Sequence, residues 1–134
     1  MDVERLMHLP IFGELDHHDL SRIAHRVNEV EIPDGTLLIE QGALPYDVFV
    51  LEEGTVEVTH DGESVATLGA GDVVGEIALL NPQRRTASVR ATSPVRAVVL
   101  RTEDLDVLAE EMPEVLRQLR TIAERRIREL EERR

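Results

Sequence analysis

Short apolar segments alternate with turn residues through the middle of the chain. Seven of the eight glycines fall between Gly35 and Gly75, where they separate these segments. Apolar segments of this length, bounded by Gly, Pro, Asn or Asp, are typical of β-strands. The predicted strands cover residues 30–32, 36–40, 48–53, 55–60, 63–68, 86–91 and 95–101.

The spacing of these strands favours antiparallel pairing, because no helix-length connection separates one strand from the next. Asp61-Gly62 predicts a two-residue hairpin turn, since a type I′ turn needs positive φ at both central positions. We therefore expect a mostly β fold with flanking helices. Its centre would be a double-stranded β-helix, or jelly-roll β-roll, with short N-terminal helices and a long C-terminal helix.

Helical patterns flank the strands. Residues 2–9 are predicted as a short helix ended by Pro10, and Ile11-Phe12 would supply an apolar plug. Residues 16–26 are predicted as a second helix with Asp16 as its N-cap. After the strands, we expect Thr102 to cap a helix that runs to about residue 111, and Pro113 to begin the last helix.

The last helix carries an apolar arc on its helical wheel. With Val115 and Ile122 at its edge, the arc contains Met112, Leu116, Leu119, Ala123, Ile127 and Leu130. Arg126 also falls inside it. Either the stem of Arg126 packs on the arc while its charged group reaches water, or Arg126 covers a ligand; the pattern alone leaves both readings open.

Composition limits the function classes. We expect residues 1–134 to form a single domain, with N-terminal helices (1–27), a β-roll (28–101) and C-terminal helices (102–134). Cysteine is absent, which excludes disulfides and thiolate metal sites. A net charge of −12 disfavours non-specific binding to nucleic acid. No apolar run approaches the length of a membrane span, and we expect a cytoplasmic location.

No catalytic residue, metal or cofactor is expected. The sequence offers no nucleophile–base pair and no paired carboxylates in a recognisable site. His17, His18 and His25 lack the spacing of a zinc site and are expected on a polar helix surface. Metal-dependent cupin enzymes share the jelly-roll architecture, but they need several histidines on the strands, where this chain has only His60.

One stretch carries the candidate binding chemistry. Gly71 and Gly75 bracket a tight bend, and the apolar run that follows is expected to form a helical turn whose first N–H groups are free to bind an anion. Arg85 can hold phosphate oxygens with two parallel hydrogen bonds. Thr86 adds a hydroxyl, and Glu76 is an acceptor for sugar hydroxyls.

This stretch resembles the phosphate-binding cassette of cyclic nucleotide-binding domains. The resemblance is carried by Gly75-Glu76-Ile77-Ala78-Leu79-Leu80 and by Arg85-Thr86-Ala87-Ser88-Val89-Arg90-Ala91, within a cassette of residues 71–91. The family includes the catabolite activator protein, kinase regulatory subunits and cyclic-nucleotide-gated channels. The resemblance implies a regulatory module for cyclic AMP or cyclic GMP, with a ligand bound through Gly75, Glu76, Ile77, Ala78, Arg85 and Thr86.

The resemblance also assigns the purine contacts. Counting from the cassette places Val58, Ala66 and Leu68 against the base from the sheet, and Arg126 and Leu130 over it from the terminal helix. That helix is then expected to close as a lid when ligand binds. Its apolar side could also form a homodimer seam.

Two residues bear on ligand choice. Val74 stands where many family members carry an aromatic residue, so the apolar wall is expected to be thinner there. Thr86 follows the arginine, as it does in members that accept cyclic GMP. Channels with this threonine also respond to cyclic AMP, so the choice of purine stays open.

Two alternatives to a cyclic nucleotide sensor of this kind stay open. In the first, the chain is the effector half of a transcription regulator. The sequence ends where a winged helix-turn-helix would begin and has no basic recognition helix, so DNA binding by this chain is not expected. In the second, it is a degenerate scaffold that has lost the ligand or senses another small molecule, against which Glu76, Arg85 and Thr86 argue. A regulatory module could act on an attached or partner effector domain.

Overall fold

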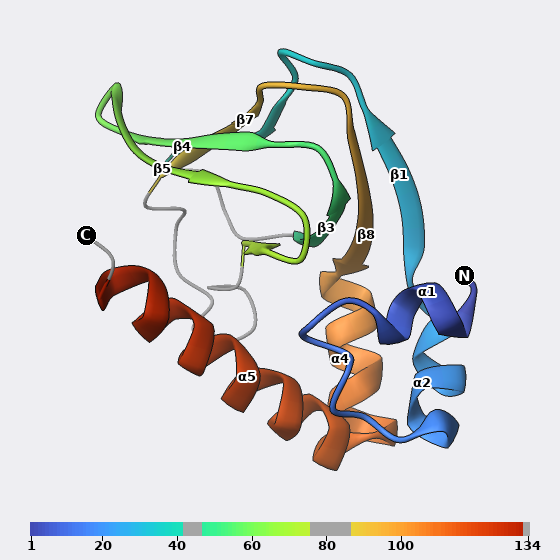
Figure 1. Ribbon diagram of the computed structural model, residues 1–134. Helices are drawn as coiled ribbons and strands as arrows, with labels where there is room; N and C mark the ends of the chain where they lie inside the picture. Colours follow the sequence, from blue (N-terminus) through green and yellow to red (C-terminus); the bar gives the residue numbers. More distant parts are fainter. Residues whose placement is uncertain (42–46, 76–86, 133–134) are drawn as a thin grey trace.

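Two antiparallel sheets form the centre of the computed structural model, which describes residues 1–41, 47–75 and 87–132 (Figure 1). Sheet A has the strand order β1-β8-β3-β6 and sheet B the order β2-β7-β4-β5. The strands are β1 (Asn28–Ile32), β2 (Leu37–Ile39), β3 (Asp47–Glu53), β4 (Val56–His60), β5 (Glu63–Leu68), β6 (Val73–Val74), β7 (Ser88–Ala91) and β8 (Val95–Arg101). The predicted jelly-roll class, mostly β with flanking helices, is confirmed.

The connections agree with the sequence signals. Asp61 has φ 51° and Gly62 has φ 82°, as a two-residue hairpin turn between β4 and β5 requires. β6 was not predicted as a strand, because two residues give no periodicity to detect. It forms only because Val73 and Val74 pair with Val50 and Phe49 of β3.

The N-terminal helices are α1 (Val3–Met7) and α2 (His17–Ala24). The predicted N-cap of α2 is confirmed, since the Asp16 carboxylate accepts from the backbone N–H of Asp19 at 2.8 Å. Both helices are shorter than predicted. α1 ends before Pro10 because the chain turns there, with the N–H of Leu9 donating to the carbonyl of Leu6 at 3.1 Å.

The C-terminal helices are α4 (Thr102–Glu111) and α5 (Pro113–Glu132). The prediction that Thr102 caps α4 is wrong: Thr102 is the first helical residue, and Arg101, the last residue of β8, holds the N-cap position. The strand continues directly into the helix, so the N-cap position falls on the last residue of β8. Instead, the Asp104 carboxylate accepts from the backbone N–H of Arg101 at 2.9 Å.

Sheet A is the middle layer of the fold, with helices on one face and sheet B on the other. The period-two alternation of side chains produces this arrangement. On β8, Val98 and Leu100 belong to the core that the helices share, whereas Val95 and Ala97 belong to the core between the sheets. The N-terminal segment adds Ile11 and Phe12, both fully buried, to the helical core, as predicted.

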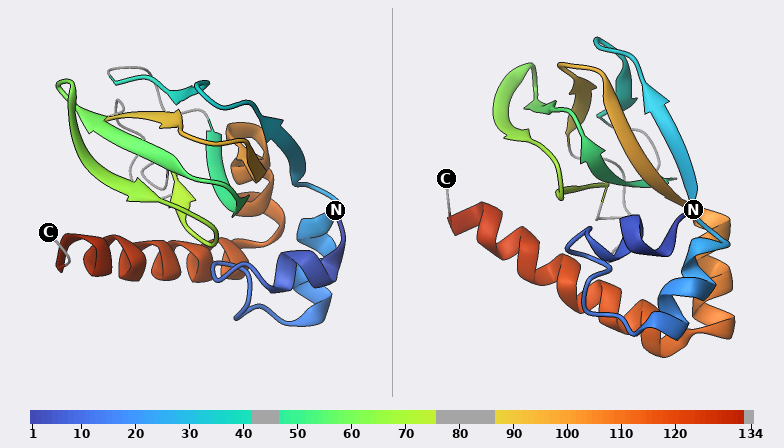
Figure 2. Two further views of the ribbon diagram at one scale, coloured as in Figure 1. Left: turned by 45° about the horizontal axis from the view of Figure 1, so that its top comes forward. Right: turned by 45° about the vertical axis from the view of Figure 1, so that its right-hand side comes forward.

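Helix α5 runs beneath the roll, and its C-terminal end lies on the side of β4 and β5 (Figures 1 and 2). Its first half is anchored in the helical core by Val115, Leu116, Leu119 and Ile122. This confirms the first part of the predicted arc, with Val115 and Ile122 buried inside it. The side chains of Ala123, Arg126, Ile127 and Leu130 lie outside the described residues. None of the helices within the described ranges is long and apolar enough to cross a membrane.

Candidate functional site

The cassette begins with a tight turn that is fixed to β3. The carboxylate of Asp72 accepts from the N–H of Gly69 at 2.8 Å, and the N–H of Asp72 donates to the carbonyl of Gly69 at 3.0 Å. Leu51 of β3 accepts from Gly71 at 2.7 Å and donates to the carbonyl of Asp72 at 2.9 Å. Gly71 has φ 90°, a conformation that favours glycine. The turn lies at residues 69–72, earlier than the predicted bend between Gly71 and Gly75, because Val73 and Val74 between the two glycines form β6.

Strand β6 then carries the chain to Gly75. Val73 and Val74 are both buried, Val73 in the helical core and Val74 in the core between the sheets. Gly75 has φ 85°, where a side chain would be strained. The direction in which the chain leaves Gly75 is therefore set by a buried strand and a glycine. Glu76, Ile77, Ala78, Arg85 and Thr86 lie outside the described residues.

The cassette ends in the other sheet. Ser88 begins β7, which pairs with both β2 and β4 in the interior of sheet B. Val89 is buried and lies opposite Val58 of β4. The two described ends of the cassette thus belong to different sheets: one at the edge strand of sheet A, the other at an inner strand of sheet B.

The residues expected to contact the base from the sheet lie on one face of sheet B. Val58 is paired with Ala66, and Val56, two residues earlier on β4, is paired with Leu68. Val56 is 0% exposed and Leu68 7% exposed, whereas Val58 and Ala66 are half-buried. This apolar face is therefore covered by the inter-sheet core at one end and open at the other. The structure brings Val58 and Ala66 together at the open end and places Leu68 in the core behind them.

The terminal helix is tied to the connection between α1 and α2. Gln118 donates its side-chain N–H to the carbonyl of Glu14 at 3.1 Å, and Arg125 forms an ion pair with the Glu14 carboxylate. The backbone of α5 continues through Arg126 and Leu130, the two predicted lid residues. Their side chains are among those that the structure does not describe, so their role stays a prediction.

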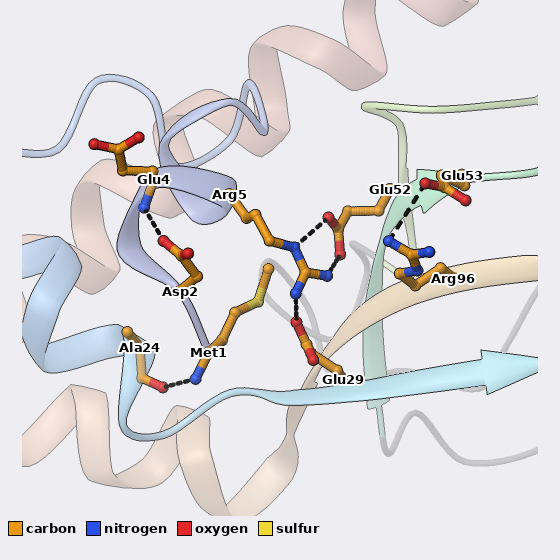
Figure 3. A network of polar contacts seen from close by, with 9 residues as sticks. All are labelled: Met1, Asp2, Glu4, Arg5, Ala24, Glu29, Glu52, Glu53 and Arg96. Carbon is orange, nitrogen blue, oxygen red and sulfur yellow. Dashed lines mark hydrogen bonds and ion pairs between the residues drawn. The ribbon is translucent and has the colours of Figure 1, made fainter.

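An ion-pair network joins α1 to the strand that holds the cassette turn (Figure 3). Arg5 donates Nε and Nη2 to the two carboxylate oxygens of Glu52, at 3.1 and 2.7 Å, and also pairs with Glu29 of β1. Hydrogen bonding to Glu52 raises the pKa of Arg5 above its ordinary value. Glu52 directly follows Leu51, which binds both Gly71 and Asp72. The residue of β3 that α1 binds, Glu52, is therefore the sequence neighbour of the residue that holds the start of the cassette, Leu51.

This network could not be predicted from the sequence, because Arg5 and Glu52 are 47 positions apart and no local pattern links them. The histidines were expected on the surface, and His17, His18 and His25 are exposed. Across the described ranges, no group of three His, Cys, Asp or Glu side chains is arranged to hold a metal ion.

Comparison with known proteins identifies the family of this chain. The family model of the cyclic nucleotide-binding domain matches residues 29–112. A cAMP-dependent protein kinase regulatory subunit from Yarrowia lipolytica is 35% identical over 97 residues, which are 71% of this chain and 26% of that protein. The hyperpolarization-activated cyclic nucleotide-gated channel 3 of Mus musculus is 28% identical over 92% of this chain and 16% of the channel.

Among solved structures, the N-terminal domain of a transcriptional regulator from Streptomyces coelicolor is similar, with a TM-score of 0.76 and 29% identity. The similarity covers 96% of this chain and 94% of that one. By contrast, the chain spans about a quarter or less of the length of the kinase subunit and the channel. Because the family model covers residues 29–112, including the whole cassette, the chain belongs to the cyclic nucleotide-binding domain family.

Proposed function

We propose that residues 1–134 form a single cytoplasmic regulatory domain that binds cyclic AMP or cyclic GMP in the cassette 71–91 and has no catalytic activity. The observation that carries the proposal is the family match across a cassette sequence whose two described ends are paired into different sheets. Ends fixed in this way suit a loop that must present main-chain donors in a defined arrangement.

In the proposed complex, the main-chain N–H groups after Gly75 and the guanidinium of Arg85 hold the cyclic phosphate. Such donors attract an anion, which the net charge of −12 on the chain would otherwise repel. The carboxylate of Glu76 accepts from a ribose hydroxyl, and Ile77, Ala78 and Thr86 complete the cassette contacts.

The purine is proposed to lie on the open apolar end of sheet B. The half-buried side chains of Val58 and Ala66 offer it an apolar surface, because burying them removes apolar area from water. Leu68 and Val74 are buried and support that surface from the core. Arg126 and Leu130 are proposed to cover the base from α5.

Signalling is proposed to occur through α5. Its first half is fixed in the helical core, so a movement would involve the part of the helix beyond Ile122. A ligand shifts such an equilibrium only if it binds one position of the helix more tightly than the other. The same helix is proposed as a homodimer seam, and an attached or partner effector domain would receive the signal.

Isothermal titration calorimetry with cyclic AMP and cyclic GMP tests the binding proposal. In an unfolding measurement at a ligand concentration of about a hundred times the dissociation constant, the free energy of unfolding should be higher by roughly 2.7 kcal/mol than without ligand. Arg85→Ala should weaken binding by roughly 10- to 100-fold, on the scale of hydrogen bonds to a charged group.

Arg84→Ala is the matched control, since it removes the same charge one residue away and should bind almost as well as the wild type. Absence of binding heat with both nucleotides would favour the degenerate scaffold. Equal losses of affinity in Arg84→Ala and Arg85→Ala would indicate a general effect of positive charge and would contradict a specific phosphate contact by Arg85.

The effector half of a transcription regulator is the second candidate, favoured by the similarity to the Streptomyces coelicolor domain. In that case, ligand binding would change how two copies associate through α5. Sedimentation velocity with and without cyclic nucleotide separates the candidates, because only this one requires ligand-dependent dimerisation.

A further inference from the structure

Gln41 is the centre of a hydrogen-bonded junction between three segments. Its backbone N–H donates to the hydroxyl oxygen of Ser88, the first residue of β7, at 2.9 Å. Its side-chain Nε2 donates to the carboxylate of Asp61 at 2.8 Å, and its Oε1 accepts from the backbone N–H of Asp61 at 2.9 Å. One residue thus connects the end of β2, the start of β7 and the tip of the β4–β5 hairpin.

The contact with the hairpin fixes an orientation as well as a distance. The amide of Gln41 and residue Asp61 exchange two hydrogen bonds, one through the side chain and one through the backbone. Two bonds in parallel resist rotation, which a single bond would allow. The backbone bond reaches the hairpin turn itself, where Asp61 has φ 51°.

The ladder of β4 with β7 is regular, with Val58 opposite Val89 and Thr59 opposite Ser88, but the ladder within the hairpin is irregular. The register of β4 and β5 shifts between Val58 and Thr59, so the pairing of the tip is out of step with the pairing of Val58 and Ala66. The β2–β7 pairing is also irregular, with a shift between Leu37 and Ile39. The bond from Gln41 to Ser88 extends that pairing beyond its last backbone partner.

We propose that Gln41 is a positioning residue for the ligand site. The β4–β7 ladder places Val58 relative to the end of the cassette. Gln41 adds a restraint on the hairpin tip, and so on Ala66 of β5, relative to Ser88, where the cassette joins sheet B. The inference rests on the proposed function, and adds that a polar contact at the hairpin tip helps to set the apolar wall. A change at Gln41 should therefore alter affinity through the position of the hairpin.

Exchanging the two partners tests the proposal. Gln41→Glu replaces the donor amide by a carboxylate that faces the carboxylate of Asp61, and cyclic nucleotide affinity should fall by roughly three- to tenfold. Adding Asp61→Asn should restore it, because the asparagine amide donates to Glu and the backbone N–H still finds an acceptor. Asparagine also tolerates positive φ better than most residues.

The double variant regains the wild-type net charge, so a charge-matched control is needed. Gln41→Glu with Glu63→Gln has the same net charge, and Glu63 is an exposed residue of the same hairpin. This control should stay weak. The methyl chemical shifts of Val58 in the ligand-free protein give a second readout, which should move in Gln41→Glu and return when Asp61→Asn is added.

The outcomes separate this inference from the proposed function. If wild-type protein binds neither cyclic AMP nor cyclic GMP, both fail. If it binds and Gln41→Glu binds equally well, only the positioning role of Gln41 is overturned. If Glu63→Gln restores affinity as well as Asp61→Asn does, the effect is one of net charge and the proposal is also overturned.

Discussion

The guanidinium of Arg5 makes two parallel hydrogen bonds to the carboxylate of Glu52, with Nε–Oε2 at 3.1 Å and Nη2–Oε1 at 2.7 Å (Figure 3). The Glu52 side chain is only 13% exposed, so its carboxylate has lost most of its contact with water. The hydrogen bonds from Arg5 replace part of that lost hydration. The pair links α1 to β3 beside Leu51, the residue that holds the cassette turn.

Arg5→Ala should lower the melting temperature, because it leaves the sheltered carboxylate of Glu52 without its partner. Adding Glu52→Gln should recover part of the loss, since an amide costs less to bury than a charge. Arg22→Ala, at an exposed arginine of α2, is the control and should have little effect. Thermal unfolding of the four proteins checks this. A double variant less stable than Arg5→Ala alone would contradict the explanation.

Gly54→Ala should destabilise the fold by about 2–4 kcal/mol. Gly54 has φ 95°, and a Cβ atom there would lie 2.3 Å from the carbonyl oxygen of Pro94. Gly35 has φ 86° but nothing within 4 Å of its Cβ position, so Gly35→Ala should cost only about 1 kcal/mol. Urea unfolding measures both, and equal losses would mean that φ strain alone determines the cost.

Leu119→Ala should cost about 2–5 kcal/mol, since the side chain is fully buried in the helical core and truncation leaves a cavity. Glu124→Ala, at an exposed position later on α5, is the control. Denaturant unfolding gives both values. If Leu119→Ala were nearly neutral, the first half of α5 would not be the anchor that the lid proposal requires.

Val58→Ala and Val56→Ala are the same change on the same face of β4. The first should mainly lower ligand affinity and the second should mainly lower stability. Val56 is fully buried, so its truncation should cost about 1–3 kcal/mol of stability. Val58 is half-buried, so its truncation should mainly weaken cyclic nucleotide binding, by roughly tenfold at most. Calorimetric titration and thermal unfolding of both variants check this. Unchanged affinity in Val58→Ala would remove Val58 from the proposed base site.

Most of the architecture could be predicted because local signals decide it. Glycine-punctuated apolar segments indicated seven of the strands, and Asp61-Gly62 indicated the hairpin turn. The errors lie where a tertiary contact decides. Val73 and Val74 form a strand only because β3 pairs with them, and Thr102 is not a cap because β8 runs into α4 without a linker.

The chemistry of the candidate site stays a prediction, and the contacts that support the site could not be predicted from the sequence. The cyclic phosphate is what the resemblance of the cassette to the cyclic nucleotide-binding domain family implies. No local rule pairs Arg5 with Glu52 or Gln41 with Asp61, since these residues meet only in the folded chain. Burial could not be predicted either: Val58 and Ala66 are half-buried, whereas Leu68 on the same face is buried.

A crystal structure of the chain grown or soaked with cyclic AMP or cyclic GMP is the most direct test of the cyclic phosphate proposal. We expect the cyclic phosphate within hydrogen-bonding distance, roughly 2.7–3.2 Å, of the Arg85 guanidinium and of backbone N–H groups after Gly75. We also expect the base against Val58 and Ala66. A ligand-free cassette at saturating nucleotide, or a guanidinium turned away from bound phosphate, would contradict it.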